Sequence, residues 1–249
     1  MKLDISKVNQ SIYDSERNLR LPSEMSERLA EDIGIMIGDG HIGRYKYGHK
    51  TDYSIYVSGN AGPDREYIIN HVVPLKYEIY NLKFPVSFVG KNKSEIRLKI
   101  CSKGLVEFYD KVIGLKVNKK IEIGIPGHIF LDKICLSACL RGILDTDFSL
   151  GFKKKEKYPV FHLKTCSSTL AKDCQRGFLA LGIKGNVYLN KKEVHSVTGR
   201  EFTTNYFFIN GRKNLRLVME RVGSNNPRII GKIEKWAHWD SNPGPIAHP

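Results

Sequence analysis

The sequence predicts an α+β protein made of two copies of one unit, and three observations support this fold class. The same order of elements, helix–strand–strand–helix–strand–strand–helix, is predicted twice along the 249 residues. Each copy opens with an apolar helix that finishes on an aspartate, Asp39 in the first and Asp147 in the second, 108 residues apart. The content of 41% hydrophobic and 27% charged residues is typical of a globular protein with a full core.

The first copy begins at Ser23 or Ser26, either of which can cap a helix whose early turns are acidic. We expect this helix to stop near Gly40. Segments rich in Tyr, Ile and Val read as strands, and one of the later helices is interrupted by Pro74. In order, we expect two strands, a helix, two strands and a closing helix at residues 41–48, 52–60, 63–83, 85–92, 95–102 and 103–114.

The second copy follows a linker at 115–128, in which Pro126 and Gly127 form the hinge. A helix over about 129–146 opens it. The strands and helices expected after that helix cover residues 149–157, 158–167, 168–182, 185–192, 203–210 and 212–223. The chain is thus expected to comprise an N-terminal arm, a first repeat, a second repeat and an irregular C-terminal tail, at residues 1–22, 23–125, 126–235 and 236–249.

The charge balance indicates a polyanionic partner. Forty Lys and Arg against 26 Asp and Glu give a net charge of +14, which favours nucleic acid by attraction and counterion release, although an unspecialised basic surface would carry it too. No segment resembles a signal peptide, and no apolar run approaches the roughly 20 residues that span a bilayer. The five cysteines include no C-x-x-C pair, so we expect no disulfide framework, no zinc site and an intracellular location, in the cytoplasm, nucleoid or an organelle.

Small residues recur at a spacing of four in the two opening helices. Gly34 and Gly38 share one face of the first helix, and Gly142 and Thr146 share one face of the second. An interior glycine costs roughly 1 kcal/mol relative to alanine, so two in one helix call for a compensating close contact. The simplest partner of each helix is the other one, and these four residues are predicted to form the interface between them.

The aspartates at the helix ends suggest a metal. A carboxylate at a helix C-terminus faces the negative end of the helix dipole, and two such carboxylates side by side repel each other. A divalent cation would relieve both effects, since carboxylate oxygen is the ligand that Mg²⁺ prefers, completed by water and phosphate. A metal held by Asp39 and Asp147 in a basic protein favours phosphodiester hydrolysis, although a single glycine-flanked aspartate after a helix is more often only a turn.

The stretches "IGIMIGDG" and "LRGILDTDF" resemble the two signature helices of the LAGLIDADG homing endonucleases, in the single-chain form that carries both copies. The likeness covers about residues 23–235. It implies two pseudo-symmetric αββαββα halves packed through the motif helices, with two antiparallel sheets forming a saddle for DNA. It also implies that an acidic residue near each motif's end binds metal between the scissile phosphates. The expected ion is Mg²⁺, with Mn²⁺ as a substitute and Ca²⁺ as an ion that binds without supporting cleavage.

Position by position, the resemblance makes Asp39 and Asp147 catalytic, and they would form the metal site together with Gly38 and Thr146. The closing glycine of the motif is kept as Gly40 but replaced by Phe148, a change that puts full activity in doubt through the backbone beside Asp147. An inner acidic position, not a metal ligand in the family, is kept as Asp145 but is Ile37 in the first copy. The family also places a basic residue near each metal site, for which the candidates are Lys119, Lys120, Arg228 and Lys232.

Several strands alternate polar and apolar residues, as expected for a sheet with one face on a core and the other on DNA. Basic side chains suit guanine edges in the major groove, and lysine clusters suit phosphates. Ordinary amphipathic strands with solvated charges would give the same pattern. The predicted DNA contacts are Arg44, Lys46, Lys91, Lys93, Arg97, Lys99, Lys153, Lys154, Lys155, His162, Lys164, Lys191 and Lys192.

The leading interpretation is a site-specific double-strand DNA endonuclease, intron-encoded or free-standing, acting as a monomer on a long, roughly palindromic duplex with unequal half-sites. An RNA-splicing maturase that binds host intron RNA is the second interpretation, because the family includes such proteins. A catalytically silent DNA-binding protein comes third, since both aspartates are present. An intein is not expected, because the chain begins with Met and does not end in Asn.

Overall fold

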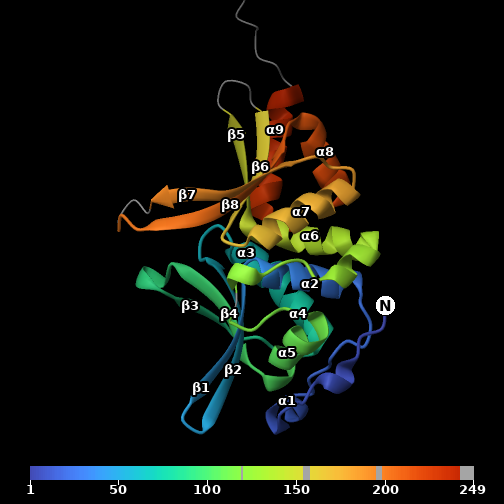
Figure 1. Ribbon diagram of the computed structural model, residues 1–249, viewed down its shortest axis with the longest axis vertical. Coiled ribbons are helices and arrows are strands. Elements are labelled where there is room, and N and C mark those ends of the chain that lie inside the picture. Colours follow the sequence, from blue (N-terminus) through green and yellow to red (C-terminus); the bar gives the residue numbers. More distant parts are fainter. Residues whose placement is uncertain (119, 154–157, 195–197, 242–249) are drawn as a thin grey trace, which may run out of the picture.

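The computed structural model describes residues 1–118, 120–153, 158–194 and 198–241, apart from the side chains of Lys120 and of residues 237–241. It consists of two halves, each with a four-stranded antiparallel sheet (Figure 1). The first sheet has the order β1-β2-β4-β3 and the second the matching order β5-β6-β8-β7, which confirms the duplicated α+β fold. The strands are β1 Gly40–Tyr47, β2 Lys50–Asn60, β3 Val86–Val89, β4 Glu95–Cys101, β5 Phe148–Lys153, β6 Tyr158–Thr165, β7 Asn186–Val194 and β8 Glu201–Asn210.

Helices cover one face of each sheet. In the first half, the expected interruption at Pro74 takes the form of a π-helical turn over Ile68–Val72, just before the proline. A second π-helical turn, Phe108–Ile113, continues the helix that follows β4 and ends at Gly114. The helices of the chain are α1 Ile12–Glu16, α2 Glu27–Ile37, α3 Arg65–Tyr67, α4 Val73–Tyr80, α5 Lys103–Glu107, α6 Lys133–Asp147, α7 Ser168–Ala180, α8 Arg212–Arg221 and α9 Pro227–Ser241.

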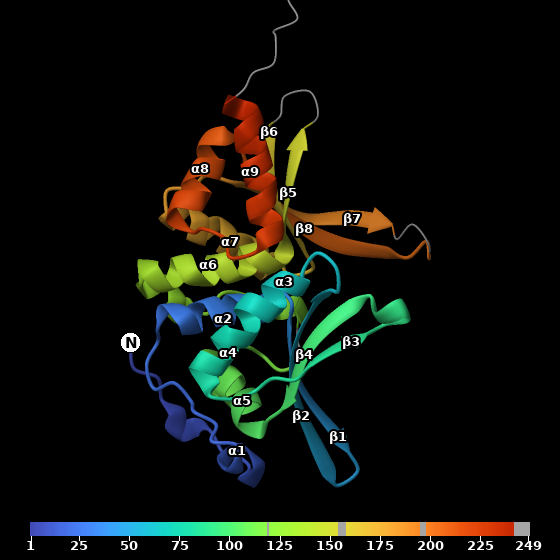
Figure 2. The same ribbon diagram turned by 180° about the vertical axis from the view of Figure 1, so that it is seen from behind.

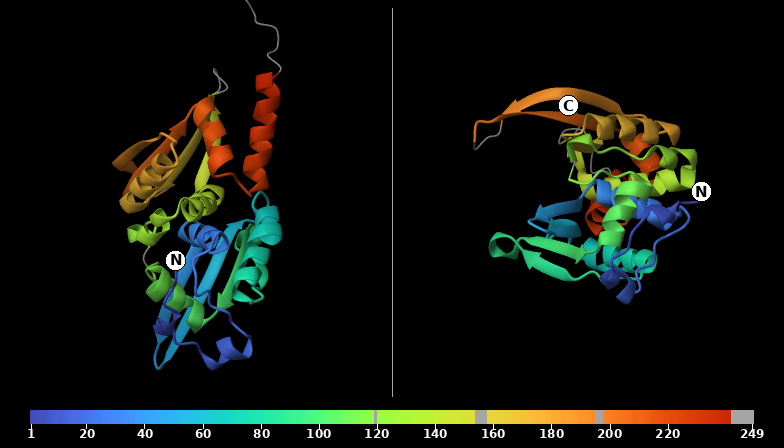
Figure 3. Two further views of the ribbon diagram at one scale, coloured as in Figure 1. Left: turned by 90° about the vertical axis from the view of Figure 1, so that its right-hand side faces the viewer. Right: turned by 60° about the horizontal axis from the view of Figure 1, so that its bottom comes forward.

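The strand registers fix which side chains face the helices. Ile55 of β2 pairs with Ile100 of β4, and Val57 pairs with Leu98, and all four are buried. In the second sheet Leu163 pairs with Phe207, and both are likewise buried. Since side chains alternate along a strand, the residues between these form the opposite face of each sheet, which no helix covers in Figures 2 and 3. We call these the open faces.

Two parts of the chain differ from the sequence-based expectation. The tail predicted as irregular at 236–249 begins inside a helix, because α9 runs from Pro227 to Ser241 and buries Trp236 against Phe152. Residues 242–249 lie outside the described part. The N-terminal arm is not merely a polar extension, since the buried Asp14 accepts hydrogen bonds from the Ser102 hydroxyl and the Gly104 amide of the first half.

Within the described residues no helix is both long and apolar enough to cross a bilayer. The five cysteines are all free thiols, and Cys135, Cys139 and Cys174 are buried.

Candidate active site at the end of the two packed helices

Helices α2 and α6 pack side by side between the two halves (Figures 1 and 2). Their backbones approach so closely at Gly34 and Gly142 that neither position has room for a side chain. A Cβ atom on Gly142 would lie 2.7 Å from the Ile35 amide nitrogen, and one on Gly34 would overlap the carbonyl oxygen of Cys139. These glycines therefore set the separation of the two helices, and with it the spacing of the helix ends.

The two motif aspartates are brought together where α2 and α6 end. A Cβ atom on Gly38 would lie 2.8 Å from the Thr146 Cβ and 3.3 Å from an Asp147 carboxylate oxygen. Asp147, the last residue of α6, thus reaches across the interface to the backbone that immediately precedes Asp39. Both aspartates are only half-buried, so solvent or a ligand can reach this site.

The backbone around the site is held by hydrogen bonds from both halves. The Ser58 amide donates to the Asp39 carbonyl at 3.2 Å, which joins the turn after α2 to strand β2. The Thr146 hydroxyl donates to the Gly142 carbonyl at 2.8 Å, which satisfies that hydroxyl within its own helix. Hydrogen bonds within the protein therefore fix the backbone at both motif ends.

Phe148 replaces a glycine without distorting the second motif. It is buried in the second core, with its ring 5.8 Å from that of Phe178 and 6.2 Å from that of Phe207, and its backbone is extended. Gly40, its counterpart, has no such space, because a Cβ there would meet the Met36 carbonyl oxygen at 2.5 Å. The junction between α6 and β5 therefore accommodates a side chain, whereas the matching junction between α2 and β1 excludes one.

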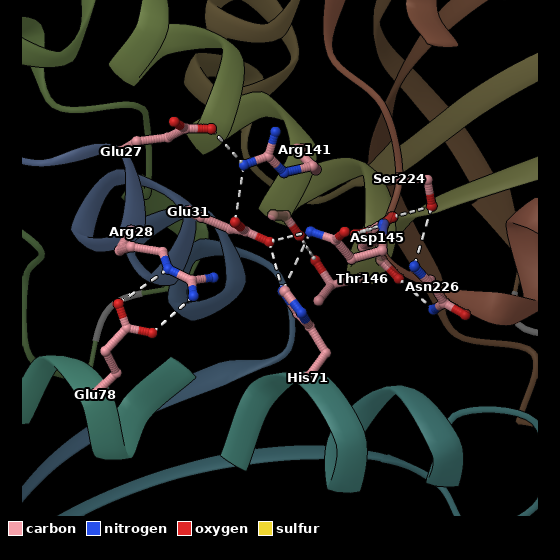
Figure 4. Close-up of polar contacts among 12 residues, drawn as sticks. Glu27, Arg28, Glu31, His71, Glu78, Arg141, Asp145, Thr146, Ser224 and Asn226 are labelled. Carbon is pink, nitrogen blue, oxygen red and sulfur yellow. Dashed lines mark hydrogen bonds and ion pairs between the residues drawn. The ribbon is translucent and has the colours of Figure 1, made fainter. Parts of the chain in front are cut away.

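Asp145 lies two residues before Asp147 and faces the chain leading into α9. It is buried and accepts hydrogen bonds from the Ser224 hydroxyl and the Asn225 amide, while Asn226 donates to its carbonyl at 2.8 Å (Figure 4). Burial raises the pKa of this carboxyl to about 6, against those hydrogen bonds, and the nearby negative charge of Glu31 also acts to raise it. The side chain therefore binds the loop of the second half that leads into α9.

A buried polar network centred on Glu31 crosses the interface, and the sequence analysis did not identify it. Glu31 of α2 accepts from Arg141 of α6 at 2.9 Å, from His71 at 2.6 Å and from Asn225 at 2.7 Å (Figure 4). Burial would raise the pKa of Glu31, but the hydrogen bonds and charges of His71 and Arg141 lower it to about 2. The sequence held one signal for this network: Glu31 and Arg141 are charged residues of opposite sign, and each stands among the apolar residues of one motif helix.

Tyr67 of α3 lies beside this network and beside the motif end. Its ring stacks on His71 at 5.5 Å, and its hydroxyl is buried and makes no hydrogen bond with any described residue. Burial raises the pKa of this phenol well above its usual value, and the negative charges of Asp145, Glu31 and Asp39 add to the shift. The hydroxyl is therefore a neutral donor held close to the acidic site.

The basic candidates occupy different positions. Lys232 of α9 donates to the carbonyl of Leu150, three residues after Asp147, at 3.1 Å. At the matching position of the first half, the Asn118 amide donates to the carbonyl of Ile42, three residues after Asp39, at 3.0 Å. Arg228 instead forms an ion pair with Asp64, at 3.3 Å, and so ties α9 to the first half. Lys119 and the side chain of Lys120 lie outside the described part, and in the sequence they are the first and second residues after Asn118.

The first sheet places Arg97 and Lys99 on its open face and Arg44 and Lys46 on the other. Arg44 shares a face with the buried Ile42 and pairs with Asp110 of the covering helical segment at 3.2 Å. This placement argues against a base contact by Arg44. The neighbouring open-face residues of β1 and β2 are aromatic instead, with His41 stacked 4.6 Å from Tyr56 and Arg97 over the same tyrosine at 4.8 Å.

In the second sheet His162 and Lys164 of β6 lie on the open face, as do Lys153 and Lys191 by strand register, whereas Lys192 pairs with Thr203 on the covered side. Lys164 is engaged with Glu193 at 2.7 Å. In the first half, Lys91 and Lys93 are exposed in the short turn between β3 and β4. Lys154 and Lys155 fall outside the described residues.

The donor set at the motif ends fits a hard divalent cation. Two carboxylates and neighbouring backbone carbonyls are oxygen ligands of the kind that Mg²⁺ and Ca²⁺ prefer, and Mg²⁺ commonly takes the rest of its shell from water and phosphate. Among the described residues no three His, Cys, Asp or Glu side chains form a metal site. Asp39 and Asp147 would supply two of the ion's ligands, with water, phosphate or backbone carbonyls completing the shell.

Comparison by sequence gives limited information. No family model matches the chain. A replication factor C small subunit from Methanocaldococcus jannaschii is 28% identical over 232 residues, which is 93% of this chain but only 11% of that protein. The likeness concerns a small part of a much longer protein and does not bring that protein's role to this chain.

Comparison by structure is informative about the fold. The homing endonuclease I-DmoI in complex with DNA and Ca is 16% identical, with a TM-score of 0.56 over 84% of this chain and 97% of that one. The I-LtrWI LAGLIDADG homing endonuclease bound to target DNA is 12% identical, with a TM-score of 0.51 over 86% and 90%. Full-length DUF199/WhiA from Thermatoga maritima is 13% identical, with a TM-score of 0.50 over 94% and 68%. The resemblance seen in the two motifs is thus confirmed at the level of structure: the chain has the two-sheet fold of the LAGLIDADG homing endonucleases.

Proposed function

We propose that the chain is a site-specific DNA endonuclease that hydrolyses both strands of a duplex at the paired aspartates. The observation that carries this proposal is the approach of Asp147 to the Gly38–Asp39 backbone across the α2–α6 interface. The fold alone does not carry it, because one fold hosts many functions. Two half-buried carboxylates at the centre of a protein of net charge +14, between two open sheet faces, suit a phosphodiester substrate.

Each residue of the proposed site has a role that its position allows. Asp39 and Asp147 would jointly hold a divalent cation, Mg²⁺ or Mn²⁺, which when bound would activate water and stabilise the leaving oxygen, whereas Ca²⁺ would bind without supporting cleavage. Lys232, beside β5, and Lys119 or Lys120, next to Asn118, would offset the negative charge that develops on phosphate. Glu31, Arg141 and the two glycines hold the helix ends in register.

The substrate in this proposal is a long, roughly palindromic duplex contacted by both halves of one chain. The two half-sites would be unequal, because the open faces of the two sheets carry different side chains. In this proposal the chain acts as a monomer, because both motif ends are present in one chain. The copies of I-DmoI and I-LtrWI described above were bound to DNA, which supports this choice of substrate.

Cleavage of a duplex that joins the flanking sequences of this gene's locus tests the proposal. The reactions would contain Mg²⁺ or EDTA, and the proteins would be wild type, Asp39→Asn and Asp147→Asn, with Asp4→Asn at an exposed site as the matched control. We expect Mg²⁺-dependent double-strand cutting at one site, unchanged in Asp4→Asn and lowered at least about a thousandfold in both motif variants. Tight binding without cutting would instead identify a silent DNA-binding protein.

A further inference from the structure

One buried hydroxyl of the first half differs from the others. Tyr67 of α3 is 3% exposed, and its hydroxyl makes no hydrogen bond with any described residue. The other two tyrosines buried in the described part, Tyr80 and Tyr109, are both hydrogen-bonded to the Asp32 carboxylate. Most buried hydroxyls in folded proteins are bonded, and a phenylalanine would fill the same space without a polar group to satisfy. The hydroxyl of Tyr67 therefore indicates a partner from outside the chain.

Tyr67 stands at the start of a π-helical turn. The turn covers Ile68–Val72 and lies just before Pro74, which has no amide hydrogen for a regular helix. The matching helix of the second half, α7, is a continuous α-helix. Within the turn lies His71, whose ring stacks on that of Tyr67 with centroids 5.5 Å apart and planes 18° apart. Such turns often occur at functional sites, so the local backbone supports a role for this pair.

Tyr67 is connected to both motif helices through His71. The His71 ring is hydrogen-bonded to Glu31 of α2 at 2.6 Å (Figure 4). Asn225 links this pair to α6, since its side chain lies 3.3 Å from His71 Nε2 and its amide donates to the Asp145 carboxylate at 2.8 Å. The phenol is thus packed against the network that joins the two motif helices.

The hydroxyl lies within reach of several carboxylates, of which Asp39 is the most open to solvent. Burial raises the pKa of the Tyr67 phenol well above its usual value, and the negative charges of Asp145, Glu31 and Asp39 raise it further. Glu31 and Asp145 are buried and accept hydrogen bonds from groups of the protein, whereas Asp39 is only half-buried. The phenol therefore stays neutral beside a carboxylate that a solvated ligand can reach.

We propose that Tyr67 is a positioning residue for the ion held by Asp39 and Asp147, and that its hydroxyl binds a water ligand of that ion. The inference rests on the proposed function, in which water completes the shell of the ion. A neutral phenol can accept a hydrogen bond from such a water and donate its own proton to a neighbouring carboxylate. It would thus fix the position of the water without adding charge to the site. Outer-shell partners of this kind commonly change metal affinity or activity by about 10–100-fold.

Tyr67→Phe tests the inference, because it removes the hydroxyl and keeps the ring. The matched control is Tyr80→Phe, which removes a buried hydroxyl that donates to Asp32 at 2.7 Å. Three quantities would be measured for the wild type and both variants. They are the midpoint of thermal unfolding in EDTA, the Ca²⁺ affinity of the protein bound to the joined-flank duplex, and the single-turnover rate of cleavage in Mg²⁺.

We expect Tyr67→Phe to keep its unfolding midpoint within about 2 °C of the wild type, because it loses no hydrogen bond to a described residue. Its Ca²⁺ affinity and its cleavage rate should both fall about tenfold. Tyr80→Phe should behave in the opposite way. Its midpoint should fall by about 4 °C or more, while its Ca²⁺ affinity and cleavage rate stay within about twofold of the wild type.

A Ca²⁺ affinity of Tyr67→Phe within about twofold of the wild type would overturn the inference, and a lowered midpoint in that variant would then identify a hydroxyl with a structural role only. The endonuclease can fail separately. A wild-type protein that binds Ca²⁺ and the duplex without cutting in Mg²⁺ would contradict the proposed function, while the Ca²⁺ affinities would still decide the role of Tyr67. A wild-type protein that binds no Ca²⁺ would overturn both.

Discussion

The two halves of this protein are alike at their common interface and different on their outer faces. Where α2 meets α6, each half supplies a glycine at the crossing and an aspartate at the helix end, and the close backbone contact leaves no room for a side chain at either glycine. On the open faces the same strand positions hold Arg97 and Lys99 in one half but Tyr206 and Phe208 in the other. Close packing between the halves restricts which residue types fit at a position in both copies, whereas matched positions on the exposed faces can carry different residue types.

Phe148→Gly tests whether the second motif needs its aromatic residue. The substitution restores the motif glycine but removes a ring packed between Phe178 and Phe207, so we expect it to cost about 3–5 kcal/mol in unfolding free energy. Urea denaturation measures the loss. Cleavage should not rise at temperatures where the variant is folded, and a gain in cleavage with little loss of stability would show that Phe148 distorts the site.

Gly34→Ala tests the closeness of the helix interface. The added methyl group overlaps the carbonyl of Cys139, so we expect the variant to lose about 2–4 kcal/mol in unfolding free energy or to separate the helices. The matched control is Gly231→Ala in α9, where a Cβ meets nothing and the change should stabilise the helix by up to about 1 kcal/mol. Equal effects of the two substitutions would show that the α2–α6 contact is looser than described.

Arg141→Met tests the polar link between the halves. It would leave the buried Glu31 carboxylate with His71 and Asn225 but without the guanidinium of Arg141, and we expect a cost of about 2–4 kcal/mol. The cost should fall when Glu31→Gln is added, because the double variant no longer buries an uncompensated charge. A double-mutant cycle of thermal unfolding measures this coupling, and additive losses would contradict the network.

Asp145 supplies a pH dependence to the second half that the first half, with Ile37 at that position, lacks. Its folded pKa of about 6 lies above its ordinary value of 3.8, so the folded state holds the proton more tightly than the unfolded state. Its contribution to stability is therefore present below about pH 4 and is lost as the pH rises to about 6, by an amount on the order of 1–3 kcal/mol. Unfolding measured between pH 4 and 7 should show this decline, and Asp145→Asn should flatten it.

Glu31 acts with the opposite sign and in a lower window. Its pKa of about 2 lies below its ordinary 4.5, so its stabilisation is present above about pH 4.5 and is lost as the pH falls towards 2. The two windows overlap only at about pH 4 to 4.5, where the two effects oppose each other, so the part of a decline between about pH 4.5 and 6 that Asp145→Asn removes is assigned to Asp145.

The sequence was sufficient where a pattern had one structural meaning. Apolar periodicity, the glycine spacing and the recurrence of Asp39 and Asp147 predicted both motif helices and the duplicated fold. The sequence was insufficient where the position of a residue depended on which other element it packs against. Arg44 follows the alternation expected of a DNA-facing residue, but it lies on the same face of the sheet as Ile42, and strand pairing places that face against the helices. Helix α9 was missed because Asn226-Pro227 reads as a turn, although Ile229, Ile233 and Trp236 recur at helical spacing.

The measurement that tests the paired-aspartate site most directly is calorimetric titration of Ca²⁺ into the protein bound to the joined-flank duplex, since Ca²⁺ is expected to bind without cutting. Wild type, Asp39→Asn, Asp147→Asn and Asp145→Asn would be compared. If the two motif aspartates hold the ion together, both of their variants lose most of the Ca²⁺ affinity and Asp145→Asn keeps it. Wild-type affinity in either Asp39→Asn or Asp147→Asn would contradict a site shared between the two halves.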